Sequence, residues 1–253
     1  MATYLLQAFG CKVSQYDSQR LAQHLQAWGL TVAEEGTPPD LFVLNSCSVT
    51  VRAAQKARQA LHAIRRKWPN TRIILAGCEA KNRDLGAADS VDADGVLLPG
   101  AATEQVAELL QRLGFGKPAN QGFPEGLQQQ LSTTRTRAFL KIQDGCNQFC
   151  TYCIVPHLRG RETSKLPDEA FVEAEQLVKS GYREIVLTGI HLGKFESGLV
   201  PLLRRLESLD GLDRIRLSSI EPLEVGDDLI EWLATSSKAC RHFHLPLQAG
   251  EDQ

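Results

Sequence analysis

The stretch that decides how the second half of the chain folds reads Gln143-Asp-Gly-Cys-Asn-Gln-Phe-Cys-Thr-Tyr-Cys-Ile-Val-Pro156. It places Cys146, Cys150 and Cys153 in a C-x3-C-x2-C array, so three thiols fall within eight residues. Gly145 and Pro156 predict an irregular loop here rather than a helix or a strand. Soft thiolates gathered this closely select zinc or the iron of an iron–sulfur cluster.

The spacing favours iron over zinc. A closed zinc site needs four protein ligands, and no fourth Cys or His completes a tight local set. His157 follows Cys153 too closely for the usual zinc-finger spacing. Three cysteines on a four-iron cluster would leave one iron open to bind something else. A zinc knuckle, or a set of reduced buried thiols, is the alternative.

These residues resemble a known family. C-x3-C-x2-C is the signature of the radical S-adenosylmethionine (SAM) enzymes, and Tyr152 before the third cysteine also fits that signature. The longer string from Gly145 through Arg159-Gly-Arg161 resembles the methylthiotransferase branch. The resemblance implies a [4Fe-4S] cluster on Cys146, Cys150 and Cys153, with SAM bound at its open iron.

The first half of the chain alternates between expected strands and helices. The expected strands are Tyr4–Phe9, Leu30–Ala33, Leu41–Leu44, Arg72–Ala76 and Gly95–Leu98. The expected helices begin near Ser14, a good N-cap residue, near Val51 and near Thr103. This alternation predicts a parallel, doubly wound α/β sheet, and we expect the flavodoxin-like strand order 2-1-3-4-5.

Three further cysteines follow the first, third and fourth expected strands: Cys11, Cys47 and Cys78. In the flavodoxin-like order these strands are adjacent, and neighbouring strands lie ~4.8 Å apart. The three thiols are therefore expected within ~10 Å of one another, where they could hold a second cluster. Three unrelated buried cysteines are the alternative, because free Cys is common in cores.

The resemblance extends to these segments. Phe9–Ser18, Leu44–Thr50 and Ala76–Lys81 resemble the three cysteine segments of the methylthiotransferase amino-terminal domain. It implies an auxiliary [4Fe-4S] cluster on Cys11, Cys47 and Cys78 that is linked to sulfur transfer. Ser14 and the pair Glu79 and Lys81 depart from the residues expected there.

After the first domain (1–113), a Gly- and Pro-rich linker is expected at 114–134, followed by a radical SAM domain at 135–253. The expected strands there are Arg137–Ile142, Glu184–Leu187, Arg214–Ile220 and His242–Leu247. The expected helices are Pro167–Ser180, Leu199–Leu209 and Asp227–Thr235. These would be the opening strands of a partial β/α barrel, a fold whose active sites lie at the carboxyl ends of the strands.

The resemblance also implies a SAM pocket at that end of the barrel. The candidate SAM-binding residues are Tyr152, Thr188, Gly189, Ser219 and Glu221. Taken alone, Glu221 and His244 are more often structural than functional. Cys240 belongs to no motif and is expected to be a plain buried thiol.

Basic residues gather in two places. The Thr50–Lys67 helix carries six of them and no acidic residue, and the segment from Arg135 to Arg161 holds five against one acid. Such faces suit a phosphate backbone. The candidate RNA-binding residues are Arg52, Lys56, Arg159 and Arg161. A solvated helix face, or a charge that balances a thiolate-bound cluster, would explain them equally well.

Composition bounds the class of protein. Of 253 residues, 43% are hydrophobic and 23% are charged, which is ordinary for a globular protein. The net charge of −2 gives no overall case for nucleic acid. Seven cysteines without a signal peptide or a long apolar run indicate a reducing cytoplasm and no membrane. The chain stops at Gln253, before the rest of the barrel and the small RNA-binding module of the family, so we expect a truncated member.

The resemblance is strongest to enzymes that add a methylthio group to carbon 2 of N6-threonylcarbamoyladenosine beside the tRNA anticodon. It implies SAM and two [4Fe-4S] clusters as cofactors. The implied partners are the tRNA anticodon loop, a flavodoxin- or ferredoxin-type reductant and a sulfur donor. The alternatives are methylthiotransferases for isopentenyladenosine in tRNA or for a ribosomal protein aspartate, and a non-catalytic iron–sulfur or RNA-binding fragment.

Overall fold

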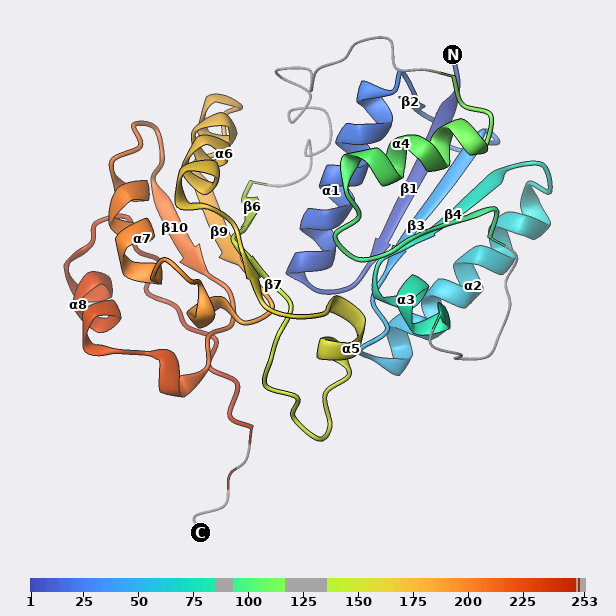
Figure 1. Ribbon diagram of the computed structural model, residues 1–253. Helices are drawn as coiled ribbons and strands as arrows, with labels where there is room; N and C mark the ends of the chain where they lie inside the picture. Colours follow the sequence, from blue (N-terminus) through green and yellow to red (C-terminus); the bar gives the residue numbers. More distant parts are fainter. Residues whose placement is uncertain (85–92, 117–135, 249, 251–253) are drawn as a thin grey trace. The chain divides into compact units, whose positions relative to one another are not determined.

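The computed structural model describes residues 1–84, 93–116, 136–248 and 250 (Figure 1). It divides into two compact units, Met1–Leu127 with His157–Arg159, and Gln128–Pro156 with Gly160–Gln253. Most of the linker predicted at 114–134 lies outside the described residues.

The first unit is built on a five-stranded parallel sheet. Its strands are β1 (Thr3–Phe9), β2 (Thr31–Val32), β3 (Leu41–Ser46), β4 (Arg72–Ala76) and β5 (Gly95–Leu97). They pair in the order β2-β1-β3-β4-β5, and every pair is parallel. The predicted flavodoxin-like order is therefore confirmed. All six residues of β3 are buried, as expected for the central strand of a sheet covered on both faces.

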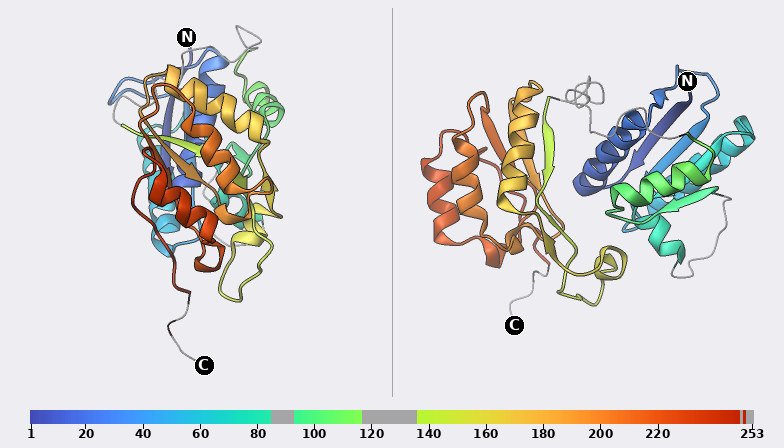
Figure 2. Two further views of the ribbon diagram at one scale, coloured as in Figure 1. Left: turned by 90° about the vertical axis from the view of Figure 1, so that its left-hand side faces the viewer. Right: turned by 45° about the horizontal axis from the view of Figure 1, so that its top comes forward.

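Four described helices cover this sheet: α1 (Lys12–Ala27), α2 (Val51–Lys67), α3 (Cys78–Asp84) and α4 (Thr103–Arg112). α1 and α4 lie on one face and α2 on the other (Figures 1 and 2). Leu61 of α2 packs on Phe42 and Leu44 of β3. No described helix combines the length and the apolar character needed to cross a membrane.

Two helix starts differ from the expectation. α1 begins at Lys12, not near Ser14, because only Gly10 and Cys11 connect it to β1. Cys11 is its N-cap residue, and Ser14 is buried inside the first turns. α3 was not predicted, since its seven polar-rich residues show no apolar period. It makes Cys78 the first residue of a helix.

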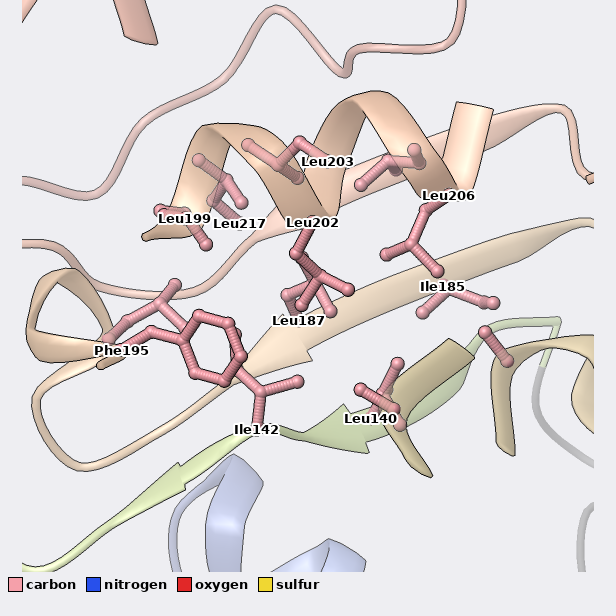
Figure 3. Close-up of a cluster of buried hydrophobic side chains, with 14 of the residues drawn as sticks. Leu140, Ile142, Ile185, Leu187, Phe195, Leu199, Leu202, Leu203, Leu206 and Leu217 are labelled. Atoms are coloured by element: carbon pink, nitrogen blue, oxygen red, sulfur yellow. The ribbon is translucent and has the colours of Figure 1, made fainter. Parts of the chain in front are cut away.

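The second unit contains a three-stranded parallel sheet in the order β10-β9-β6. The strands are β6 (Ala138–Lys141), β9 (Glu184–Thr188) and β10 (Arg214–Leu217), and a short antiparallel pair joins β7 (Gln143–Asp144) to β8 (Thr163–Ser164). The helices are α6 (Pro167–Lys179), α7 (Leu199–Glu207) and α8 (Asp227–Thr235), while α5 (Val155–Arg159) starts in this unit and ends in the residues that group with the first unit. Figure 3 shows leucines of α7 meeting strand residues such as Leu187 in the core of this unit.

The fourth expected strand, His242–Leu247, does not form. In its place the chain makes only isolated parallel bridges, Ser219 with His244 and Ile215 with Ala239. Pro246 has no amide hydrogen to donate to a ladder, which explains why pairing does not continue past the bridge at His244. The interpretation of Pro156 as part of an irregular loop is also wrong, because Pro156 lies in the first turn of α5.

Candidate metal centres

Three cysteines meet at the carboxyl edge of the first unit's sheet. β1 ends at Phe9, β3 at Ser46 and β4 at Ala76, one or two residues before Cys11, Cys47 and Cys78 respectively. The thiols of Cys47 and Cys78 hydrogen-bond to each other, and the Cys47 sulfur also accepts from the backbone N–H of Cys11. The strand order thus brings the three predicted ligands to one place.

The electrostatics of the cup formed by Cys11, Cys47 and Cys78 favour a thiolate at Cys47. The hydrogen bond with Cys78 lowers the pKa of Cys47 to about 6, although burial opposes the shift. The backbone N–H of Val49 also donates to the Cys47 sulfur, over 3.4 Å. The shared hydrogen bond and burial raise the pKa of Cys78. The pair therefore retains a proton that a metal ion would displace, because thiolates, not thiols, ligate metals.

Arg159 supplies positive charge to the same cup. The segment His157–Arg159 groups with the first unit, and Arg159 Nη2 lies 2.9 Å from Asp17 Oδ2 on α1. The guanidinium side chain is only 2% exposed, and it lowers the pKa of both Cys47 and Cys78. With so little of its side chain exposed, Arg159 is poorly placed to contact RNA.

Asn45, buried near the end of β3, connects the elements that carry Cys47 and Cys11. Its side-chain amide donates to the Ser14 carbonyl oxygen over 2.9 Å and to the Ser18 hydroxyl over 2.7 Å. These bonds tie the strand that leads to Cys47 to the helix that Cys11 caps. Ser14, which departs from the expected family residue, therefore has a structural place in this network.

The second centre is the loop between β7 and α5. The Cys153 N–H donates to the Cys150 carbonyl over 2.9 Å, and the Gln148 N–H donates to the Cys146 sulfur over 3.4 Å. Phe149, between the first two cysteines, has a left-handed backbone with φ of 47°. A bulky residue in that region is unusual and tends to mark a functional site. These two hydrogen bonds and the positive φ of Phe149 turn the chain between the three cysteines.

The surroundings of Cys146 favour its protonated thiol over the thiolate, so binding a metal there would have to displace a proton. Burial raises the pKa of its free thiol, and Glu162, Cys153 and Cys150 add to the shift, which places the other two sulfurs nearby. Cys146, Glu162 and His191 each bring one ligand atom within 4.8 Å of the others. The sequence reasoning missed Glu162 and His191, although His191 lies within the string Leu187–Gly193 that resembles the family.

The candidate SAM-binding residues fall into three groups in the second unit. The Tyr152 hydroxyl donates to the Gln248 side chain, whose amide donates to Glu221 over 3.1 Å. The Ser219 hydroxyl and His244 Nδ1 lie 2.6 Å apart. Thr188, buried at the end of β9, and Gly189 beside Gln143 lie after the second strand. Gln248 therefore links two of the candidates directly.

Comparison with known proteins follows the same division. Residues 3–97 match the model described as uncharacterized protein family UPF0004, and residues 140–253 match the radical SAM superfamily. A threonylcarbamoyladenosine tRNA methylthiotransferase of Bacillus subtilis is 36% identical over 265 aligned residues, which include all of this chain. The chain is therefore similar over its whole length to radical SAM methylthiotransferases.

Other relatives carry two substrate names. A tRNA-2-methylthio-N(6)-dimethylallyladenosine synthase of Pelotomaculum thermopropionicum is 32% identical over the whole chain. The chain spans 59% of the Bacillus relative and 60% of the Pelotomaculum relative. The structure of a radical SAM methyltransferase, TsrM from Kitasatospora setae, matches with a TM-score of 0.59 at 15% identity, covering 96% of this chain and 60% of that one. It supports the fold alone.

The remaining candidate residues lie at the surface or are half-buried. Arg52 and Lys56 are exposed on α2, one turn apart, and Arg161 is exposed in the second unit. Cys240 is half-buried, and burial raises the pKa of its thiol. Its backbone N–H donates to Ile215.

Gly145 offers a test of the cysteine loop. It has φ of 72°, and a Cβ there would lie 2.0 Å from the Arg161 carbonyl oxygen. Gly160, the C-cap residue of α5, has φ of 76° but nothing within 4 Å of such a Cβ. We expect Gly145→Ala to lose the metal of this loop, while Gly160→Ala meets no clash and costs ~1–3 kcal/mol for a backbone conformation used almost only by glycine. Iron analysis after anaerobic reconstitution checks this, and equal iron in both variants would contradict it.

Proposed function

We propose that this chain is a radical SAM methylthiotransferase that uses two [4Fe-4S] clusters. Cys146, Cys150 and Cys153 would hold the SAM-binding cluster. The group of Cys11, Cys47 and Cys78 would hold the auxiliary one. The observation that carries the proposal is the convergence of Cys11, Cys47 and Cys78 at one sheet edge, in a chain that also carries a separate C-x3-C-x2-C loop.

When bound, the clusters would supply the electron that cleaves SAM and the sulfur that is inserted at an unreactive carbon. The chain's own residues would bind and orient. Tyr152, Gln248 and Glu221 form one connected polar row beside the cysteine loop, suited to the polar groups of SAM. Thr188 and Gly189, at the carboxyl end of β9, would complete the pocket, where barrel enzymes place their sites.

For the substrate, we propose N6-threonylcarbamoyladenosine next to the anticodon of tRNA, modified at carbon 2. Relatives of this name from Bacillus subtilis and Chlamydia pneumoniae are 36% and 34% identical to the chain. A base in a single-stranded loop can be splayed into a pocket at little cost. The second candidate is the dimethylallyl-modified adenosine, because relatives with that substrate in their names are 32–34% identical.

Exposed cations would hold the RNA. Arg52 and Lys56 lie on α2, which follows Cys47 after a short turn and carries no acidic residue. Arg161 follows the cysteine loop and is exposed. Each phosphate contact of this kind adds affinity that falls with salt. We further propose a cytoplasmic location, a flavodoxin- or ferredoxin-type reductant and a separate sulfur donor.

The experiment uses the reconstituted chain with SAM, reductant and a sulfide source. It is offered three anticodon stem-loops that carry threonylcarbamoyladenosine, dimethylallyladenosine or plain adenosine. Mass analysis of the nucleosides should find the methylthio group on the first alone. Modification of the second alone would replace the proposed substrate with the second candidate. Release of 5′-deoxyadenosine without modification of any RNA would count against this chain as a tRNA-modifying enzyme.

A further inference from the structure

His191 is a buried histidine beside a cysteine of the second centre. It lies three residues after β9, in the second unit, and is 6% exposed. Its ring has polar neighbours at both nitrogens: Glu224 at Nε2, and Glu162 with Cys146 at Nδ1. The His191 side chain is 7% exposed, so solvent screens these neighbours only weakly.

The backbone of His191 is tied to the cysteine loop. Its N–H donates to Gln143 Oε1 over 2.6 Å. The amide of the same Gln143 side chain donates to the Gly145 carbonyl over 2.8 Å. Gln143 is 1% exposed, so one buried side chain fixes the spacing between the histidine and the residue before Cys146.

Glu224 holds the far side of the ring. Its Oε1 lies 2.7 Å from His191 Nε2. The carboxylate reaches this position because Gly193 leaves room for it: a Cβ there would lie 2.1 Å from Glu224 Oε2. The side chain of Glu224 is 11% exposed, and Lys194 Nζ lies 3.8 Å from the same oxygen.

Glu162 and Cys146 share the near side of the ring. His191 Nδ1 lies 3.3 Å from Glu162 Oε1 and 3.7 Å from the Cys146 sulfur. Glu162 is itself fixed by a reciprocal pair of bonds with Asn147. Both atoms near Nδ1 are acceptors when the carboxyl and the thiol are ionised, so a single proton on Nδ1 is shared between them.

We propose that His191 is a positioning residue that donates a hydrogen bond from Nδ1 to the Cys146 sulfur and so raises the reduction potential of the SAM-binding cluster. The inference rests on the proposed function, since it requires a cluster on Cys146. Hydrogen bonds to ligating sulfurs stabilise the more negative, reduced cluster and are among the levers that set its potential. Glu162 and Glu224 act through the ring by holding its plane toward the sulfur, as outer partners do around other metal sites.

The test compares His191→Leu with His191→Asn in a chain that also carries Cys11→Ala, so that only one cluster contributes a signal. The asparagine amide can place a donor near the position of Nδ1, whereas leucine fills the space without one. Iron content is measured first, and the cluster is then titrated with reductant and followed by electron paramagnetic resonance. We expect leucine to reduce the ratio of reduced to oxidised cluster about tenfold at a fixed potential, ~59 mV for one electron. Asparagine should stay within about twofold of the Cys11→Ala parent.

Iron content tests the proposed function, and the reduction potential tests the role of His191. If the Cys11→Ala parent binds no iron, the proposed function fails and the inference with it. If both His191 variants bind iron and titrate like the parent, the proposed function stands and the hydrogen bond has no role in the potential. Loss of iron from the leucine variant alone would also overturn the inference, because His191 would then be a structural brace. Gly193→Ala, which must displace the Glu224 carboxylate, should shift the potential in the same direction as leucine.

Discussion

Replacing Cys150 with alanine is expected to abolish SAM cleavage, by more than ~100-fold, and to remove about four of eight irons per chain. Loss of a direct ligand should exceed the 10–100-fold effects seen when only outer partners of a metal are changed. Cys150 is exposed, so its removal leaves no cavity in the core. The measurements are 5′-deoxyadenosine release under reductant, and iron and sulfide content after anaerobic reconstitution.

The matched control is Cys240→Ala, which removes the one cysteine outside both sets. It should keep about eight irons and cleave SAM within about twofold of the parent chain. If Cys150→Ala still cleaved SAM, the C-x3-C-x2-C loop would not be the site of that chemistry. If Cys240→Ala lost iron as well, the cysteine sets would be wrongly assigned.

Replacing Cys11 with alanine is expected to have the reciprocal effect. Cys11 is exposed and caps α1 without a side-chain hydrogen bond, so the fold should tolerate the change. The variant should keep about four irons and continue to release 5′-deoxyadenosine within about twofold. It should form no methylthio product on any anticodon stem-loop, because the sulfur would have no auxiliary cluster to leave from.

Pairing the two variants makes the result specific. Cys150→Ala and Cys11→Ala each remove one exposed thiol, yet only the first should stop SAM cleavage. A Cys11→Ala chain that still inserted sulfur would show that the first unit does not serve the reaction. A Cys11→Ala chain that lost all its iron would contradict two independent clusters, and with them the proposed function.

The sequence predicted the sheet of the first unit well because its signals are strong and local. Strand-length apolar runs alternate with helical segments, and the order β2-β1-β3-β4-β5 follows from the usual winding of such units. The short elements were missed. α3 has seven residues and α5 has five, and neither is long enough to show a helical period. The fourth strand was overpredicted because Pro246 outweighs the apolar residues around it.

The candidate site was predictable only as far as the cysteines. Motif spacing singled out six candidate ligands, and strand order placed Cys11, Cys47 and Cys78 together. The residues around the cysteines come from far along the chain. Arg159 lowers the pKa of Cys47 and Cys78. Glu224 contacts His191, which lies beside Cys146. Pairs that are 33 or more residues apart carry no local pattern, so only the folded chain identifies them.

The central claim is that two separate cysteine sets each hold a four-iron cluster, and metal analysis of the unmodified chain tests it most directly. After anaerobic reconstitution, iron and acid-labile sulfide should both reach about eight per chain. About four irons would contradict the second cluster, and zinc or an absence of bound metal would contradict both.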